Sequence, residues 1–227
     1  MKENDKTSHR AELMRDIVAM VNQNPVLKQA WQRKKEKSIQ NTEFEYPEHL
    51  SVEHIDMGLF KMEYLTWNGS ENPYVILQLH GMELRTNGEP MPAGLVAMSP
   101  WTDLAITGES YTKNREIDPV FGADGGGEML LHSPYIGEND AKNPLISPMY
   151  GNFTGFPPML IQVGTHEMLY DDAASVAKKA KEQGVPVRFT VYEGMFHVFQ
   201  MSGTVIPESK HAWEEVGAFM HKVMGQW

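Results

Sequence analysis

The C-terminal part of the chain contains a strand-length apolar run, then a helical segment and then a second such run. Residues 159–163 form the first run and residues 187–192 the second. Between them, residues 172–183 have a helical pattern that ends at Gly184, a common C-terminal stop. Strand, helix, strand is typical of a parallel sheet with crossover helices. We therefore predict an α/β fold with a mostly parallel sheet and flanking helices. Two more strands and a last amphipathic helix complete it, at residues 74–79, 95–98 and 208–223.

The N-terminal part is predicted to be helical. Apolar residues recur at helical spacing within residues 8–35, and Ser8 is a candidate N-cap with Glu12 at capping-box distance. Asn24-Pro25 interrupts this pattern, and a second amphipathic piece follows the break.

Farther along, two segments that alternate apolar and polar residues, 51–57 and 59–67, predict a half-exposed hairpin. Residues 105–158 are rich in loop-forming residues. A chain of 227 residues with 41% hydrophobic content can bury a substantial core, so we expect one domain.

Charge and composition exclude several functions. The net charge is −10, whereas a nucleic-acid surface needs clustered Lys and Arg. The absence of cysteine excludes disulfides and thiolate metal sites. No signal peptide is visible, and no apolar run approaches the roughly 18 residues that a membrane span needs. We expect a cytoplasmic protein with no membrane span, no nucleic-acid partner, no metal and no cofactor.

An acid and a histidine each follow a predicted strand near the C-terminus. Glu167 follows the strand at 159–163, and His197 follows the strand at 187–192. The carboxyl ends of parallel strands lie at one edge of the sheet, where open α/β proteins keep their sites. An imidazole with a carboxylate to orient it can act as a general base. We therefore predict an acid–base pair at this edge.

Alternatives remain open for both positions. Asp171 or Asp172 could orient the imidazole in place of Glu167, or could simply cap the helix that begins there, which we favour. A histidine taken alone is more often a structural residue than a catalyst.

No serine of the sequence stands in a nucleophile elbow, because the motif G-x-S-x-G occurs nowhere. His80-Gly81 ends the strand at 74–79, where acyl-transfer enzymes present backbone N–H groups to an oxyanion. Here Met82 follows instead of further glycines. Ser99 is the one nearby hydroxyl to consider as a replacement, although a Ser before Pro is more typical of a turn.

Several stretches of the chain have a distinctive sequence. They include Ser-Pro-Trp-Thr-Asp-Leu at residues 99–104 and Asn-Pro-Leu-Ile-Ser-Pro-Met-Tyr-Gly at residues 143–151. Together with the strand that ends in His80-Gly81 and the segments around Glu167 and His197, they resemble the hormone-sensitive-lipase-like group of α/β-hydrolase esterases.

This resemblance implies an α/β-hydrolase fold and a small acyl ester as the substrate. Glu167 matches the acid and His197 the histidine of a Ser-His-acid triad. Residues 1–45 match the helical cap over the acyl pocket, and residues 46–227 match the sheet core. Two aromatic residues are candidates for the pocket wall, with a structural role as the alternative: Trp101 and Phe196.

The departure from the family pattern lies just after the strand at 74–79. Family members continue from the histidine as H-G-G-G and run through two more parallel strands, with G-D-S-A-G-G at the elbow. A segment of about one βαβ unit plus the elbow is therefore missing between Gly81 and Met82. These two residues keep only a part of the oxyanion loop, and the sheet is expected to be truncated at its centre.

Two hypotheses about function follow. The chain belongs to a lineage of carboxylic ester hydrolases for short-chain esters and is inactive as written, because it lacks the nucleophilic serine. The alternative is a non-catalytic pseudoenzyme or interaction protein. Strand edges shaped for lost neighbours would lower the stability or pair with another copy, so a homo-oligomer is one expected outcome.

Overall fold

The structure, a computed structural model, describes residues 7–23, 50–56, 61–67, 88, 91–122 and 127–225. The chain divides into two compact units, residues 29–81 and the remainder. The predicted strand at 74–79 and the second N-terminal helical piece lie outside the described residues. The expectation of a single domain with a cap at residues 1–45 stays a prediction.

The smaller unit contains an antiparallel hairpin. Strands β1 (Leu50–Asp56) and β2 (Lys61–Trp67) pair from Leu50 opposite Trp67 to Asp56 opposite Lys61. This confirms the hairpin that the alternating sequence predicted.

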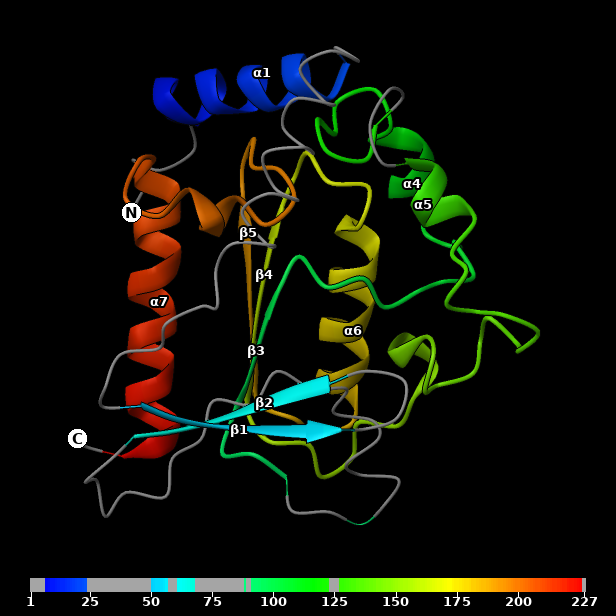
Figure 1. Cartoon of the computed structure of the whole chain (residues 1–227), viewed down its shortest axis with the longest axis vertical. Coiled ribbons are helices and arrows are strands. Elements are labelled where there is room, and N and C mark those ends of the chain that lie inside the picture. The colour runs from blue at the N-terminus through cyan, green and yellow to red at the C-terminus, as the bar shows by residue number, and fades with distance from the viewer. Residues whose placement is uncertain are drawn as a thin grey trace. The chain divides into compact units, whose positions relative to one another are not determined.

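The larger unit contains the parallel sheet. Its strands β3 (Leu95–Met98), β4 (Met159–Gly164) and β5 (Val187–Tyr192) lie side by side in this order and all run the same way (Figure 1). Every residue of the middle strand β4 is buried, as expected for a strand that helices cover on both faces. The predicted α/β architecture is therefore confirmed.

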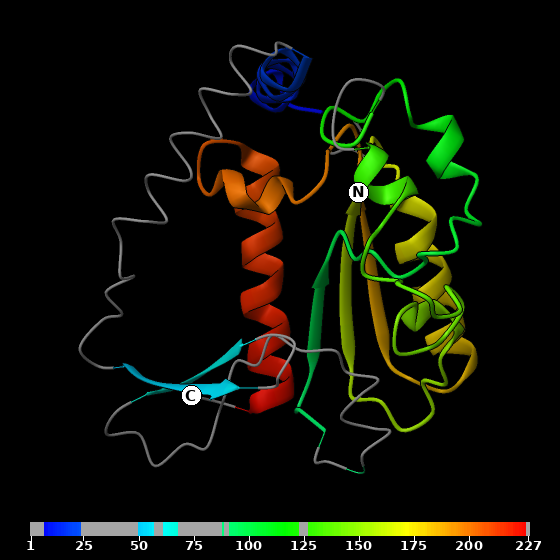
Figure 2. The ribbon, with the colours of Figure 1, turned by 45° about the vertical axis from the view of Figure 1, so that its right-hand side comes forward.

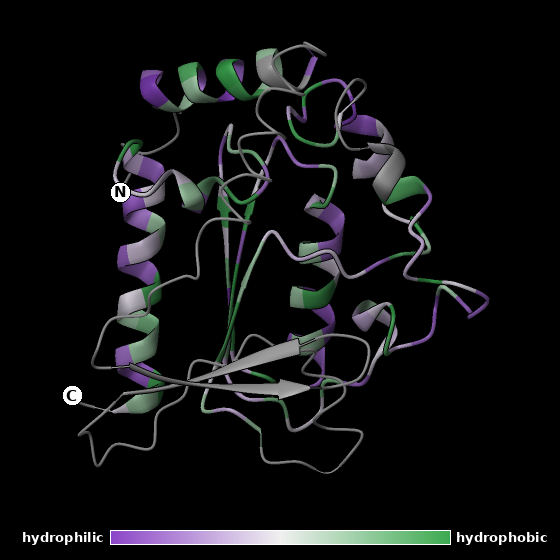
Figure 3. Ribbon diagram, in the orientation of Figure 1, coloured by the Kyte–Doolittle hydropathy of each residue, from purple (hydrophilic) through white to green (hydrophobic). Residues whose placement is uncertain are grey.

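Helices α6 (Tyr170–Glu182) and α7 (Pro207–Met224) cover opposite faces of this sheet (Figure 2). Ile161 of β4 packs in the cluster formed with α6, whereas its neighbour Leu160 packs in the cluster formed with α7. Successive strand residues point to opposite faces, so the short apolar run of β4 serves both helices. Along both helices, hydrophilic and hydrophobic residues are interspersed (Figure 3).

The helices described in the connection between β3 and β4 are short. They are α4 (Ser110–Lys113), α5 (Gly127–Leu131) and the 3-10 helix η1 (Pro148–Tyr150). A second 3-10 helix, η2 (Phe199–Ser202), leads into α7. Among the described residues, no helix is both long and apolar enough to cross a membrane.

Helix α1 (His9–Gln23) lies across the carboxyl ends of the strands (Figure 1). Ser8 caps it as predicted, since its Oγ accepts the Ala11 N–H at 3.2 Å. The carboxylate that completes the cap is not Glu12 but Glu208 of α7, which accepts the Ser8 N–H at 2.6 Å. The side chain at the third helical position is Ala11, which cannot reach back, so a residue distant in sequence takes that role.

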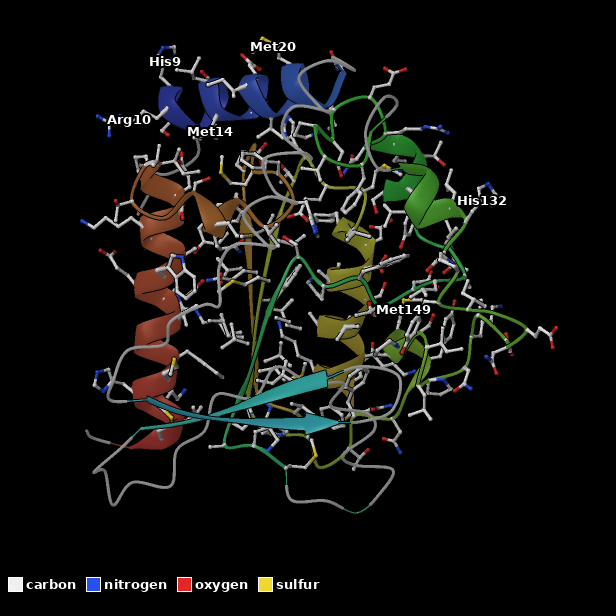
Figure 4. All side chains as sticks on the ribbon, viewed as in Figure 1. His9, Arg10, Met14, Met20, His132 and Met149 are labelled. Atoms are coloured by element: carbon white, nitrogen blue, oxygen red, sulfur yellow. The ribbon has the colours of Figure 1, made fainter. Side chains whose placement is uncertain are left out.

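The two sides of α1 differ in their surroundings. Met14 lies on the side that faces the rest of the unit and packs against the cluster around Phe199. Met20 lies on the opposite side (Figure 4) and is 55% exposed. Ala11 is fully buried. Packing of this side of α1, in addition to the cap, therefore holds α1 against the rest of the larger unit.

Candidate active site

Three adjacent strand ends supply the polar side chains of the site. Ser99 directly follows β3, Glu167 comes shortly after β4, and His197 comes shortly after β5. Because these strands are parallel neighbours, their carboxyl ends lie at the same edge of the sheet. The structure thus brings Glu167 and His197 together, as their positions after parallel strands predicted, and it places Ser99 beside them.

The carboxylate of Glu167 faces the imidazole of His197. Its Oε2 lies 3.3 Å from Nδ1, and the two side chains are 0% and 19% exposed. The ring of Phe121 packs edge-on against the imidazole, with 4.6 Å between ring centroids. With a proton on Nδ1 held by Glu167, Nε2 is the basic nitrogen. An imidazole fixed in this way can take a proton from a hydroxyl group at Nε2.

Two further donors bind the other oxygen of this carboxylate. Oε1 of Glu167 accepts the Ser99 hydroxyl at 2.8 Å and the Gly164 N–H at 2.6 Å. Burial raises the pKa of the Glu167 carboxyl, and the hydrogen bonds from His197, Gly164 and Ser99 oppose that rise. The donors therefore favour the ionised form that an imidazolium partner requires.

A close backbone approach holds the turn that carries Glu167. The N–H of His166 donates to the carbonyl oxygen of Met195 at 3.0 Å. A Cβ atom at Gly164 would lie 2.0 Å from that same carbonyl oxygen. Only a glycine therefore allows the acid-bearing turn and the histidine-bearing loop to lie against each other.

Two polar side chains of the loop-rich segment hold the acid from another direction. Asn114 donates from Nδ2 to the backbone carbonyl of Glu167 at 2.7 Å. Asp118 accepts the N–H groups of Met168 at 2.7 Å and of Phe121 at 3.0 Å. These two roles were not predicted, because the partners in the acid-bearing turn are backbone groups 53 and 50 residues away. No local pattern marks such contacts.

Asp171 and Asp172 do not act as the predicted helix caps. The N-cap of α6 is Leu169, without a side-chain cap. Asp172 instead accepts the N–H groups of Thr102 and Asp103, each at 2.7 Å, and Asp171 accepts the N–H of Ser110 at 2.8 Å. Both aspartates thus join the start of α6 to the segment that follows β3. Glu167 is the acid that contacts the imidazole.

The remaining predicted site residues have other surroundings. Trp101 packs in the cluster around Tyr111, and Phe196 is buried in a separate cluster. These contacts suit structural aromatics, so a role in the pocket wall stays a prediction. Gly81 and Met82 lie outside the described residues. In the part of the chain that the structure describes, no three metal-binding side chains come together to hold an ion.

A sequence profile of the α/β-hydrolase fold matches residues 75–201, more than half of the chain. The matched range contains both Glu167 and His197. A parallel sheet between two helical layers, with an acid and a histidine beyond its strand ends, is the arrangement of this class. The chain belongs to the α/β-hydrolase-fold family.

Curated relatives with sequence similarity include two hydrolytic enzymes. An acetyl-hydrolase of Streptomyces hygroscopicus is 39% identical over 143 residues, which cover 63% of this chain and 47% of the relative. An esterase of Acinetobacter venetianus strain RAG-1 is 34% identical over 139 residues, 61% of this chain and 45% of the relative. The chain spans about half the length of the curated relatives it matches. They confirm the predicted esterase lineage.

Solved structures confirm the fold. The structure of EstE7, a hormone-sensitive-lipase homologue from a metagenome library, superposes with a TM-score of 0.74 at 20% identity, covering 97% of this chain and 100% of that chain. An esterase of the bacterial hormone-sensitive lipase family superposes with a TM-score of 0.72 at 21% identity and the same coverage.

Proposed function

We propose that this chain carries the acid and the base of a short-chain acyl ester hydrolase but no serine to act as their nucleophile. The observation that carries the proposal is the contact of 3.3 Å between His197 Nδ1 and the fully buried carboxylate of Glu167. The similarity to an acetyl-hydrolase and an esterase supports acyl esters as the substrate class of the lineage.

Each residue has a defined role in such a mechanism. Nε2 of His197 accepts the proton of a hydroxyl group while the hydroxyl oxygen attacks the ester carbonyl carbon, and it later returns the proton to the leaving alcohol. Glu167 holds the proton on Nδ1 and stabilises the imidazolium that forms. General acid–base catalysis of this kind contributes about 10²–10⁴-fold to a rate.

Ser99 does not provide that hydroxyl. Its Oγ donates to Glu167 Oε1 at 2.8 Å and accepts the N–H of Val198 at 3.0 Å. The Ser99 hydroxyl thus gives its proton to the acid, whereas a nucleophile must donate its proton to Nε2 of the imidazole. Since the sequence has no G-x-S-x-G, we infer that the chain as written is not a serine hydrolase.

The test is hydrolysis of p-nitrophenyl acetate by the wild type, by His197→Ala and by His211→Ala. His211 is a matched control, because it is exposed on α7 and its ion-pair partner is Glu214, at 3.8 Å. We expect equal background rates in all three proteins and no stoichiometric labelling by a fluorophosphonate, because neither variant removes a working nucleophile.

Two results would contradict the proposal. One is a rate that falls in His197→Ala and not in His211→Ala, which would show catalysis through the imidazole. The other is labelling of one hydroxyl per chain by the fluorophosphonate, which would show an activated serine.

A further inference from the structure

Ser99 holds an unusual backbone conformation at the centre of the site. Its φ is +48°, in the left-handed region that residues other than glycine seldom adopt. Val198, directly after His197, has φ +47° and ψ +40°. A left-handed conformation is strained for a β-branched residue and persists only where the surrounding contacts hold it.

The hydroxyl group of Ser99 connects these two strained residues. Val198 N–H can only donate, so Ser99 Oγ is its acceptor, at 3.0 Å. An ionised carboxylate can only accept, so the Ser99 hydroxyl proton is donated to Glu167 Oε1, at 2.8 Å. One side chain that is 2% exposed therefore contacts the acid and the backbone beside the base.

The geometry points to Ser99 as a positioning residue that holds Glu167 and His197 in register. This inference rests on the roles proposed above for that pair. Ser99 follows β3, Glu167 follows β4 and Val198 follows β5, so its hydroxyl bridges the ends of three strands. The backbone N–H of Ser99 also donates to the backbone carbonyl oxygen of Gln162 in β4 at 2.8 Å, which fixes the Ser99 backbone relative to the sheet.

The contacts predict what loss of the hydroxyl does. Without it, Val198 loses the acceptor of its N–H and Glu167 loses one of its donors, so the loop of His197 and the carboxylate are each free to shift. The contact between Nδ1 and Oε2 should then weaken. A hydrogen bond to a charged acceptor is stronger than one to a neutral acceptor, and its strength depends on distance and alignment. The strength of the bond between His197 and Glu167 therefore reports how the two side chains are placed.

The experiment follows the Nδ1 proton of His197 by nuclear magnetic resonance at low temperature. We expect a low-field resonance in the wild type that is absent in Glu167→Gln and in His197→Asn. It should be lost or move upfield in Ser99→Ala. It should do the same in Ser99→Gly, which also lacks the hydroxyl but adopts a positive φ without strain and is therefore the better variant for folding.

Ser147→Ala is the matched control. Ser147 is fully buried, and its Oγ, like that of Ser99, donates one hydrogen bond and accepts one from a backbone N–H. It donates to the carbonyl oxygen of Ala141 at 2.6 Å and accepts the N–H of Leu104 at 2.8 Å. Its removal should lower the melting temperature about as much as Ser99→Ala does, while the His197 resonance stays unchanged. Loss of stability alone therefore cannot produce the expected signal.

The outcomes separate the two proposals. A wild type without the resonance would overturn the acid–base pair, and with it both proposals. A resonance that stays at its wild-type position in folded Ser99→Gly would overturn the role of Ser99 and leave the pair intact. If neither variant at this position folds, exchange of the Val198 amide in the wild type decides: slow exchange supports the bond to Ser99, and exchange as fast as in an open loop overturns it.

Discussion

At the scale of single residues, a buried carboxyl group near the site holds a neighbouring segment through its backbone N–H groups. Asp172 is 1% exposed and accepts two backbone N–H groups from the segment after β3. Burial raises the pKa of the Asp172 carboxyl to about 7, although the N–H groups of Thr102 and Asp103 act against that rise. The folded chain therefore keeps a proton on this residue over a pH range in which the unfolded chain has released it.

This proton gives the stability a definite dependence on pH. Between the ordinary value of 3.8 and about 7, the folded state binds more protons at Asp172, so the contribution is present at low pH and is lost as the pH rises through 7. One proton corresponds to a slope of at most about 1.4 kcal/mol per pH unit. We expect Asp172→Asn to remove this slope from the free energy of unfolding, measured in urea between pH 4 and pH 8.

Asp171→Asn is the control for this prediction. Asp171 occupies the neighbouring position of α6, accepts a single backbone N–H and is less buried. The free energy of unfolding of Asp171→Asn should keep the pH slope that Asp172→Asn loses. Parallel curves for the wild type and Asp172→Asn would show that another group carries the proton.

At the scale of elements, one carboxylate joins α7 to the sheet. Glu215 has a side chain that is 2% exposed. Its oxygens accept hydrogen bonds from Gln162 at 2.7 Å, Thr190 at 2.7 Å and Tyr192 at 3.1 Å, and it forms an ion pair with Arg188. These partners come from β4 and β5, so the contacts fix where α7 lies on its face of the sheet.

Replacement of Glu215 by Ala should leave the buried donors without an acceptor. A buried donor left without its acceptor costs roughly 1–3 kcal/mol, and with more than one such donor we expect the free energy of unfolding in urea to fall by about 3 kcal/mol. Glu214→Ala is the control on the same helix, because Glu214 is 60% exposed and only forms surface pairs. Its effect should stay within about 0.5 kcal/mol. Similar losses in both variants would contradict the role of Glu215.

At the scale of the whole molecule, the proposed acid–base pair of Glu167 and His197 occurs in a sequence that has no G-x-S-x-G motif. If a segment was lost between Gly81 and Met82, its return should restore catalysis. We expect a chain that has H-G-G-G and a βαβ unit followed by a G-D-S-A-G-G elbow inserted at this junction to hydrolyse p-nitrophenyl acetate. The rate should exceed that of the present chain by about 10²-fold or more, because the pair then has a hydroxyl to activate.

The gain must depend on the imidazole of the pair and on the inserted hydroxyl. His197→Ala and replacement of the inserted serine by alanine should each abolish it, whereas His211→Ala should not. A folded insert variant without activity, judged folded by circular dichroism, would contradict the interpretation of the junction.

The elements were predictable because their signals are local. Apolar periodicity and turn residues indicated the strands at 95–98, 159–163 and 187–192, and the structure has them as Leu95–Met98, Met159–Gly164 and Val187–Tyr192. Parallel strands put their carboxyl ends at one edge, which was enough to expect Glu167 and His197 near each other.

Local signals say nothing about partners that folding brings from far along the chain. Ser99 pairs with Val198 across 99 residues, and Ser8 with Glu208 across 200. Asp172 was predicted from its position to cap α6, and it binds the segment after β3 instead. Local patterns were therefore sufficient for β3, β4, β5, α6 and α7 and for the edge of the sheet at which Glu167 and His197 lie. Which buried hydroxyl and carboxyl groups hold these two residues there follows from the packing of the folded chain, because a buried polar group takes the partner that packing places within reach.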